Sequence, residues 1–259
     1  MECANLLSWA RKSRASAPQD SAEESWSTLC RIGGVAAFFL MAYSLGTMVQ
    51  LVVLGEPPST ANAAFSLLQK SRWLGLLRLD LPTMLALPLY YLVFLGLFAA
   101  LRRSDVAYAT LSTLLAFVGV TLTLATPTAL SLLFLSDKYA AATTEPVRVQ
   151  LLAAGEAVLA TDVWHGTGAI IGGLLLQSGA VLISAVMLRS NVFDRVVAYL
   201  GIVTHGLDLA HGLLGPLAPG DSFVLMAMAG PLYLIWLPLV GRRLLQLGRL
   251  GAPRAQGAS

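Results

Sequence analysis

Six runs of apolar residues, separated by short polar or charged segments, make up most of the chain. Each is at least close to the roughly 20 residues that an α-helix needs to cross the hydrocarbon core of a bilayer. The runs cover residues 33–54, 81–101, 106–136, 166–188, 196–217 and 223–240. This pattern predicts an all-α protein, a polytopic membrane bundle of six transmembrane helices. The third run is longer than a span needs, so we expect it to tilt or to continue as a helix beyond Pro127.

The two longest connections between the runs carry a helical periodicity of their own. In residues 59–79 and 144–161, apolar side chains recur every three or four positions, which is typical of amphipathic helices. Lys70, Arg72 and Trp73 suit the headgroup region of a bilayer. We therefore expect two extracytoplasmic amphipathic helices lying at the membrane interface. A surface that docks a partner protein is the alternative.

The remaining segments divide the chain into three parts. Residues 1–30 lack the apolar stretch of a signal peptide and are interpreted as a polar cytosolic N-terminal tail. Residues 31–247 form the predicted six-helix transmembrane domain, and residues 248–259 a disordered C-terminal tail. Cys3 and Cys30 both fall on the predicted reducing side, so no disulfide is expected.

Composition and charge agree with a membrane protein. The chain is 56% hydrophobic and only 12% charged, whereas soluble domains carry about 25% charged residues. If both termini lie in the cytosol, the 17 basic residues divide into twelve on the cytosolic side and five on the opposite side. This bias predicts a plasma (inner) membrane protein with cytoplasmic N- and C-termini. Because the basic residues follow topology and form no patch, the net charge of +3 is no sign of nucleic-acid binding.

Asp208 is the single Asp, Glu, Lys or Arg residue inside the six runs. Inserting a charged group at the centre of a membrane helix costs at least about 2.5–3.5 kcal/mol, so Asp208 is expected to have a specific role. On a helix, Asp208 shares an arc of about 120° with other polar and small residues. These residues, the span-five stripe, are Gly201, Thr204, His205, Asp208, His211, Gly212 and Gly215.

The stripe predicts a site. His205, Asp208, His211 and Thr204, with Gln177 at a similar depth, are the candidate ligands of an outward-facing polar cavity that binds an ion, a proton or a small molecule. The protein would then be a non-enzymatic binding, sensing or transport component with no cofactor. One alternative is a membrane-embedded metalloenzyme using His205, Asp208 and His211, since imidazole and carboxylate suit zinc or iron. Another is an accessory or structural subunit whose stripe is a packing face.

Other polar groups complete the list of candidates. At the depth of the stripe the sequence places Tyr43, Ser44, Tyr90, Tyr91, Gln177, Ser178 and Tyr233 as possible hydrogen-bond partners. A second ionisable set, expected at the outer mouth, comprises Asp80, Glu156, Asp162 and His165. Neither a nucleophile elbow, nor a phosphate-binding loop, nor a zinc-protease motif occurs in the sequence.

Four phrases carry a resemblance to known proteins. They are Arg-Ile-Gly-Gly at 31–34, Leu-Ser-Asp-Lys-Tyr-Ala-Ala-Ala-Thr-Thr at 135–144, Gln-Leu-Leu-Ala-Ala-Gly-Glu-Ala-Val-Leu at 150–159 and Tyr-Leu-Ile-Trp-Leu-Pro-Leu-Val-Gly-Arg at 233–242. Together they resemble an uncharacterised family of bacterial six-span membrane proteins, a domain of unknown function. The resemblance implies the architecture and a bacterial inner membrane, but no activity. The expected partners are the lipid bilayer and a membrane protein or second copy of the chain.

Overall fold

The computed structural model describes residues 2–126, 128–163, 165–215 and 217–250. Over these residues the chain is helical with no strand, which confirms the all-α prediction. Six segments of the described chain are long and apolar enough to cross a membrane, and they match the six predicted runs. The predicted C-terminal tail begins inside the last helix, which reaches Leu250. Residues 251–259 and the side chain of Cys3 lie outside the described part, whereas Cys30 is a buried free thiol.

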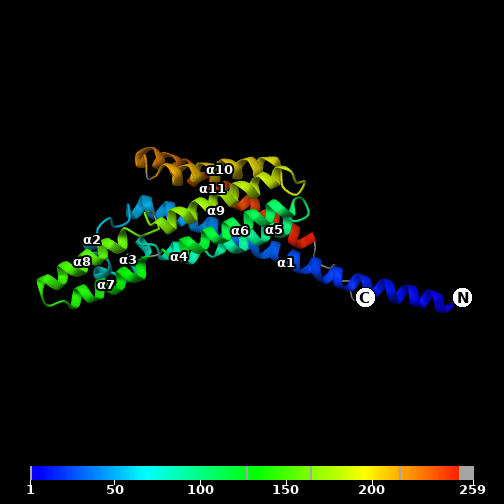
Figure 1. The fold of residues 1–259 in the computed structure, drawn as a ribbon, viewed down its shortest axis with the longest axis horizontal. Helices are drawn as coiled ribbons and strands as arrows, with labels where there is room; N and C mark the ends of the chain where they lie inside the picture. Colours follow the sequence, from blue (N-terminus) through cyan, green and yellow to red (C-terminus); the bar gives the residue numbers. More distant parts are fainter. Residues whose placement is uncertain (1, 127, 164, 216, 251–259) are drawn as a thin grey trace.

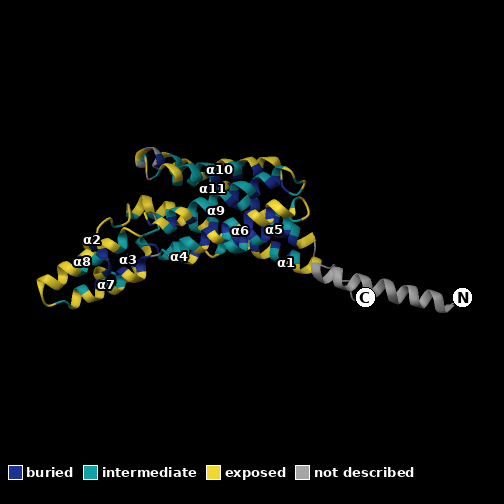
Figure 2. Cartoon of the chain, viewed as in Figure 1, coloured by how far each residue is buried: buried dark blue, intermediate teal, exposed yellow. Residues whose placement is uncertain are grey.

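The main body consists of helices that run side by side along the long axis of the molecule (Figure 1), and their contacts close into a ring of six. Each helix packs on its two neighbours in the order α1, α5, α6, α9, α10, α11 and back to α1. Their bounds are α1 (Glu2–Leu54), α5 (Leu89–Leu101), α6 (Val106–Leu124), α9 (Thr167–Leu188), α10 (Arg195–Leu214) and α11 (Pro219–Leu250). Leu97, Ile183 and Trp236 are among the side chains buried in the core of this ring. The helices therefore bury one face against each other and leave apolar residues on the outside (Figure 2).

The closest approach in the ring joins α6 and α9. A Cβ atom added at Gly119 would lie 2.5 Å from the carbonyl oxygen of Gly172, and one added at Gly172 would lie 2.6 Å from the carbonyl oxygen of Gly119. The Ser112 hydroxyl, further along the same crossing, donates to the carbonyl of Gly179 at 2.8 Å. The two backbones are thus in direct contact, as small residues permit in membrane bundles.

The second and third runs are each broken into two helices. The second consists of α4 (Leu81–Ala86) and α5, with Pro88 as the residue before α5. The third consists of α6 and α7 (Ala129–Ala141), so the helix is not continuous past Pro127, which itself lies outside the described residues. The 19 residues of α6 alone extend about 28 Å, nearly the full hydrocarbon thickness. Helix α7 is therefore free to fold away from the ring.

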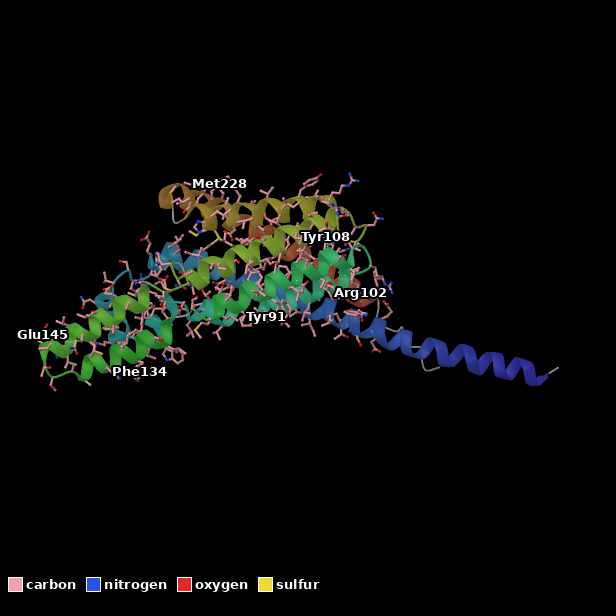
Figure 3. All side chains as sticks on the ribbon, viewed as in Figure 1. Tyr91, Arg102, Tyr108, Phe134, Glu145 and Met228 are labelled. Carbon is pink, nitrogen blue, oxygen red and sulfur yellow. The ribbon has the colours of Figure 1, made fainter. Side chains whose placement is uncertain are left out.

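A second, smaller cluster of helices lies at one end of the ring, and we call it the lobe (Figure 1). It consists of α2 (Ala61–Lys70), α3 (Arg72–Arg78), α7 and α8 (Glu145–Leu159). Phe65, Leu68 and Leu132 are buried in its core. The predicted helices at 59–79 and 144–161 are therefore present, the first as two helices that meet at Ser71. Glu145 marks the far tip of the lobe and Arg102 the opposite end of the ring (Figure 3).

The second ionisable set makes three separate structural contacts in and beside the lobe. The Asp80 carboxylate accepts hydrogen bonds from the backbone N–H and hydroxyl of Thr128 and, at 2.8 Å, from the N–H of Ala129, where α7 begins. Glu156 Oε1 accepts from the N–H of Ala61 at 2.8 Å, where α2 begins. These carboxylates satisfy the free N–H groups of helix starts. Asp162 Oδ1 accepts from the N–H of His165 at 2.8 Å and lies 2.9 Å from its Nδ1.

Replacing Asp80 with alanine should detach the start of α7. The change leaves two backbone N–H groups buried without an acceptor, and each such group costs about 1–3 kcal/mol. We expect a drop of that size or more in the unfolding free energy of the purified protein in detergent. Asp137→Ala is the control, because that carboxylate is 51% exposed in its ion pair with Arg72 and should contribute less than about 1 kcal/mol. Equal losses in both variants would contradict the buried cap.

Candidate functional site

The span-five stripe faces the two neighbours of α10. Gly201 is buried against α9 and α11, where an added Cβ would lie 2.5 Å from Trp236 Nε1 and would also collide with the Ser184 hydroxyl. At Gly212 the nearest neighbour is the side chain of Leu174 on α9. The small residues of the stripe therefore let α9 and α11 approach closely, and the polar residues between them meet polar groups from both helices.

Four side chains from three helices form one hydrogen-bonded group, which we call the polar cluster. Asp208 Oδ2 accepts from Gln177 Nε2 at 2.8 Å and from the Tyr233 hydroxyl at 2.7 Å. Gln177 Oε1 in turn lies 2.7 Å from His205 Nδ1. Gln177 belongs to α9, His205 and Asp208 to α10, and Tyr233 to α11. The cluster thus ties together three consecutive helices of the ring.

The hydrogen positions in the cluster follow from its partners. The Gln177 amide is oriented with its N–H donors toward the carboxylate, so Oε1 faces His205. Because an amide oxygen only accepts, Nδ1 of His205 carries a hydrogen. Its Nε2 then keeps a lone pair when the ring is neutral. The single Tyr233 hydroxyl proton goes to Asp208 at 2.7 Å in preference to His205 Nδ1 or Gln177 Oε1, both at 3.2 Å.

The His205 imidazole is held between two aromatic rings. Its centroid lies 5.2 Å from that of Tyr233 and 4.6 Å from that of Trp236, both in edge-to-face geometry. The residue is 1% exposed. His205 Nε2 and Trp236 Nε1 are buried, and neither has a hydrogen-bond partner among the described residues. The imidazole is therefore fixed in position, with one proton-binding nitrogen left unsatisfied.

The predicted candidates divide into two groups. Gln177, His205 and Asp208 come together, whereas Thr204 donates to the carbonyl of Leu200 in its own helix at 2.7 Å. His211 Nδ1 lies 3.0 Å from the carbonyl oxygen of Ser222 near the start of α11. Both residues thus make contacts of their own, outside the hydrogen bonds of the polar cluster.

Tyr233 is the cluster residue that the sequence named only as one of several groups at a suitable depth. Among the others, the Tyr91 hydroxyl lies 2.7 Å from Thr121 Oγ1 and the Tyr43 hydroxyl 2.9 Å from Thr83 Oγ1. Depth along the span was the available signal, but it does not reveal which face of a helix a residue occupies. Tyr233 is 25 residues from Asp208 and on another helix, so the two cannot be paired until the helix order in the ring is known.

Tyr90 connects the cluster to the other side of the ring. This α5 residue interacts electrostatically with Asp208 and Tyr233 and with Tyr43 of α1. Tyr43 in turn lines a groove of about 400 Å³ between the last turns of α1 and residues Leu77 and Pro82. Thr47 and Gln50 add polar groups to a wall that is otherwise apolar. Neither Gln177 nor Asp208 lines this groove, and both side chains are partly buried.

The side chains of the stripe do not assemble a metal centre. Across the described residues, no three His, Cys, Asp or Glu side chains gather closely enough to hold a metal ion. His205 and His211 turn toward different partners, Gln177 Oε1 and the Ser222 carbonyl. The three ligands that a His205, Asp208 and His211 centre would need therefore point apart.

The chemistry of the cluster is that of a carboxylate without a counter-ion. Both hydrogen bonds to Asp208 come from neutral donors, and none of the ion pairs among the described side chains includes it. An ionised carboxylate in a low-dielectric interior is costly unless it is paired with a positive charge. Asp208 can thus take up a proton or a small cation.

Comparison of the chain with protein-family models, with curated proteins and with solved structures finds no match. The likeness to a bacterial six-span family therefore stays a prediction from the sequence.

Gly201→Ala should test how tightly α10 is packed beside the cluster. The new methyl group would collide with Ser184 and Trp236, and overpacking of this kind costs about 1–3 kcal/mol. Gly206→Ala, one and a half turns away in open space, should instead stabilise α10 by up to about 1 kcal/mol through helix propensity. Thermal unfolding in detergent compares the two. A Gly201→Ala protein as stable as Gly206→Ala would mean that α10 does not pack as described.

Proposed function

We propose that this protein is a multi-pass membrane protein that binds a proton or a small cation at Asp208, as a binding, sensing or transport component. One observation carries the proposal. The Asp208 carboxylate lies within an apolar helix and is held by Gln177 and Tyr233, two neutral donors. A charged carboxylate inside a membrane helix is energetically unfavourable, and such residues commonly bind protons, ions or ligands.

The distribution of basic residues supports an orientation for this component. The end of the ring where α1 meets the end of α11 carries Arg31, Arg102, Arg103, Arg189, Arg195, Arg242, Arg243 and Arg249. The lobe end carries Lys70, Arg72, Arg78, Lys138 and Arg148. By the positive-inside rule the first end is cytoplasmic, and the lobe is extracytoplasmic, in the inner membrane of a bacterium.

In this orientation the polar cluster lies toward the outer half of the membrane. Asp208 is six residues from the end of α10 at Leu214, or about 9 Å along the helix. The lobe would rest at the outer interface, where Trp73 is 81% exposed beside Arg72. Such a pairing of indole and guanidinium is typical of the headgroup region. The ligand would accordingly reach Asp208 from the outside.

The proposal is tested by titrating the purified protein in lipid nanodiscs. The wild type should take up about one proton more than Asp208→Asn between neutral and acid pH, or show a saturable rise in Tm with lithium, sodium or potassium that the variant lacks. Asp194→Asn is the matched control, because this exposed carboxylate at the start of α10 makes no side-chain capping bond. If the wild type and Asp208→Asn bind equal amounts of protons and none of the cations, the proposal is wrong.

The burial of the cluster favours a second candidate, a packing network in an accessory subunit. His205 and Trp236 are each 1% exposed and fully enclosed by α9, α10 and α11. Buried polar groups of this kind can fix helix order without binding anything. For that function Asp208→Asn would change the stability of the protein and leave its binding of protons and cations unchanged.

A further inference from the structure

The polar cluster contains two places where a proton can be held, and they lie one turn apart on α10. The first is the Asp208 carboxylate, and both of its hydrogen bonds end on Oδ2. The second is His205 Nε2, which is buried and has no partner in the described part of the chain. A proton is the one cation that these atoms can take without displacing a neighbour, because it needs no space of its own.

Tyr233 contacts the Asp208 carboxylate and the other ring nitrogen of His205, Nδ1. Its hydroxyl oxygen lies 2.7 Å from Asp208 Oδ2 and 3.2 Å from His205 Nδ1, so it bridges the carboxylate and the imidazole. A hydroxyl both donates and accepts, which neither end of the Gln177 amide can do. Gln177 holds the geometry, since its Nε2 binds Asp208 and its Oε1 faces His205.

We propose that Tyr233 relays a proton between Asp208 and His205, so that the ligand of the Asp208 site is a proton and the cluster is a two-position proton site. This inference rests on the proposed function and narrows it. Proton transfer through a positioned tyrosine needs heavy-atom distances close to those of hydrogen bonds, which both contacts of its hydroxyl provide.

The transfer balances in atoms and charge. It starts with an Asp208 carboxylate and a His205 imidazolium, which forms when a proton binds the free Nε2 of the resting imidazole. His205 Nδ1 gives its hydrogen to the Tyr233 oxygen, and Tyr233 gives its hydroxyl proton to Asp208 Oδ2. The step ends with a protonated Asp208, an unchanged tyrosine and a neutral His205 with its hydrogen on Nε2.

The surroundings suit the charged state, in which Asp208 is a carboxylate and His205 an imidazolium. Gln177 already presents its N–H to the carboxylate and its oxygen to Nδ1, which is the arrangement that this state requires. The Trp236 ring lies 4.6 Å from the imidazole between centroids, in edge-to-face geometry, and holds the imidazole in place in both charge states. The titratable groups that face Asp208 and His205 are Tyr233 from α11, Tyr90 from α5 and His211 from α10, with Tyr43 of α1 behind Tyr90. None of them carries a fixed positive charge.

Nitrogen-15 NMR of the histidine rings in lipid nanodiscs tests the relay, because the chain has only 3 histidines. Ring nitrogen shifts report both tautomer and charge. In the wild type the His205 signals should move over the same pH interval as proton uptake by Asp208, and Asp208→Asn should displace or abolish this movement. Tyr233→Phe should slow hydrogen exchange at the His205 ring about a hundredfold or more, the lower end of what a positioned acid–base group contributes.

Two controls accompany the measurement. Tyr91→Phe removes a hydroxyl that lies against Thr121 between α5 and α6, and it should leave His205 exchange at the wild-type rate. His165 is 73% exposed beside Asp162, and its signals should be the same in every variant, which also reports that Tyr233→Phe has folded.

The outcomes separate the relay from the binding site. His205 signals that ignore Asp208→Asn, or wild-type exchange in Tyr233→Phe, would overturn the relay, while proton uptake by Asp208 in the same samples would leave the proposed function standing. A cation-dependent rise in Tm without proton uptake would also overturn the relay, but it would agree with a cation-binding site at Asp208. If the wild type and Asp208→Asn bind protons and cations equally, both the relay and the proposed function of Asp208 are wrong.

Discussion

Gly172→Ala should lower the unfolding free energy of the protein by about 3 kcal/mol, the upper part of the range for overpacked interiors. The new Cβ would lie 2.6 Å from the carbonyl oxygen of Gly119 and 2.9 Å from the backbone nitrogen of Thr123. These are backbone atoms of α6, so no side-chain rotation can relieve the contact. Helices α6 and α9 would have to move apart along the most intimate crossing of the ring. Thermal or denaturant unfolding in detergent measures the effect.

The neighbouring glycine provides the control. Gly173 has no atom within 4 Å of an added Cβ, and Gly173→Ala should therefore stabilise α9 by up to about 1 kcal/mol. The two substitutions add the same methyl group to adjacent residues of one helix. If both raise the stability, α6 and α9 do not meet at Gly119 and Gly172, and the order of helices in the ring is wrong.

Asp208→Asn should abolish the binding of a proton or cation at the cluster and leave the protein as stable as the wild type or more so. Asparagine has the shape of aspartate and keeps an oxygen to accept from Tyr233 at the position of Oδ2. It also removes a charge that has no ionic partner among the described side chains, and replacing such a charge by a neutral group is often neutral or stabilising. Proton counting and thermal unfolding on the same preparation give both quantities.

The sign of the stability change separates function from packing. Loss of binding with unchanged or higher Tm is the result for a site. A lower Tm together with unchanged binding is the result for a structural network, and it would contradict the proposed function. Asp194→Asn, outside the apolar part of α10, should leave the Tm and its response to cations unchanged.

The sequence was sufficient to predict six segments that are helical, long and apolar enough to cross a membrane, because length and hydropathy are properties of each run alone. It was not sufficient for the division of the third run. Residues of α7 such as Leu130 and Phe134 are as apolar as those of α6. What separates them is tertiary: α7 packs on α2 in the lobe, and Asp80, distant in sequence, holds its first turn. The hydropathy of a single segment does not reveal either of these two contacts.

The same limit applies to the polar cluster, which the sequence predicted only in part. Helical periodicity placed His205 and Asp208 on one face, since that depends on α10 alone. The partners of that face depend on which helices flank α10 and how they are rotated. Gln177 was among the groups at the right depth, as was Tyr233, but so were Tyr43 and Tyr91, which bind Thr83 and Thr121 instead. His211 lies on the predicted face too, yet the turn into α11 brings the Ser222 carbonyl to it.

The most direct test of the central claim is the infrared difference spectrum of the protein in nanodiscs between neutral and acid pH. Protonation of a carboxylate produces a carboxylic acid C=O band that responds to deuterium exchange, and the Asp208 part of this band is the part that Asp208→Asn removes. We expect this band in the wild type and in Asp194→Asn, and its loss in Asp208→Asn. A wild-type band that persists unchanged in Asp208→Asn, or a wild type without one and without any cation-dependent rise in Tm, would contradict the account.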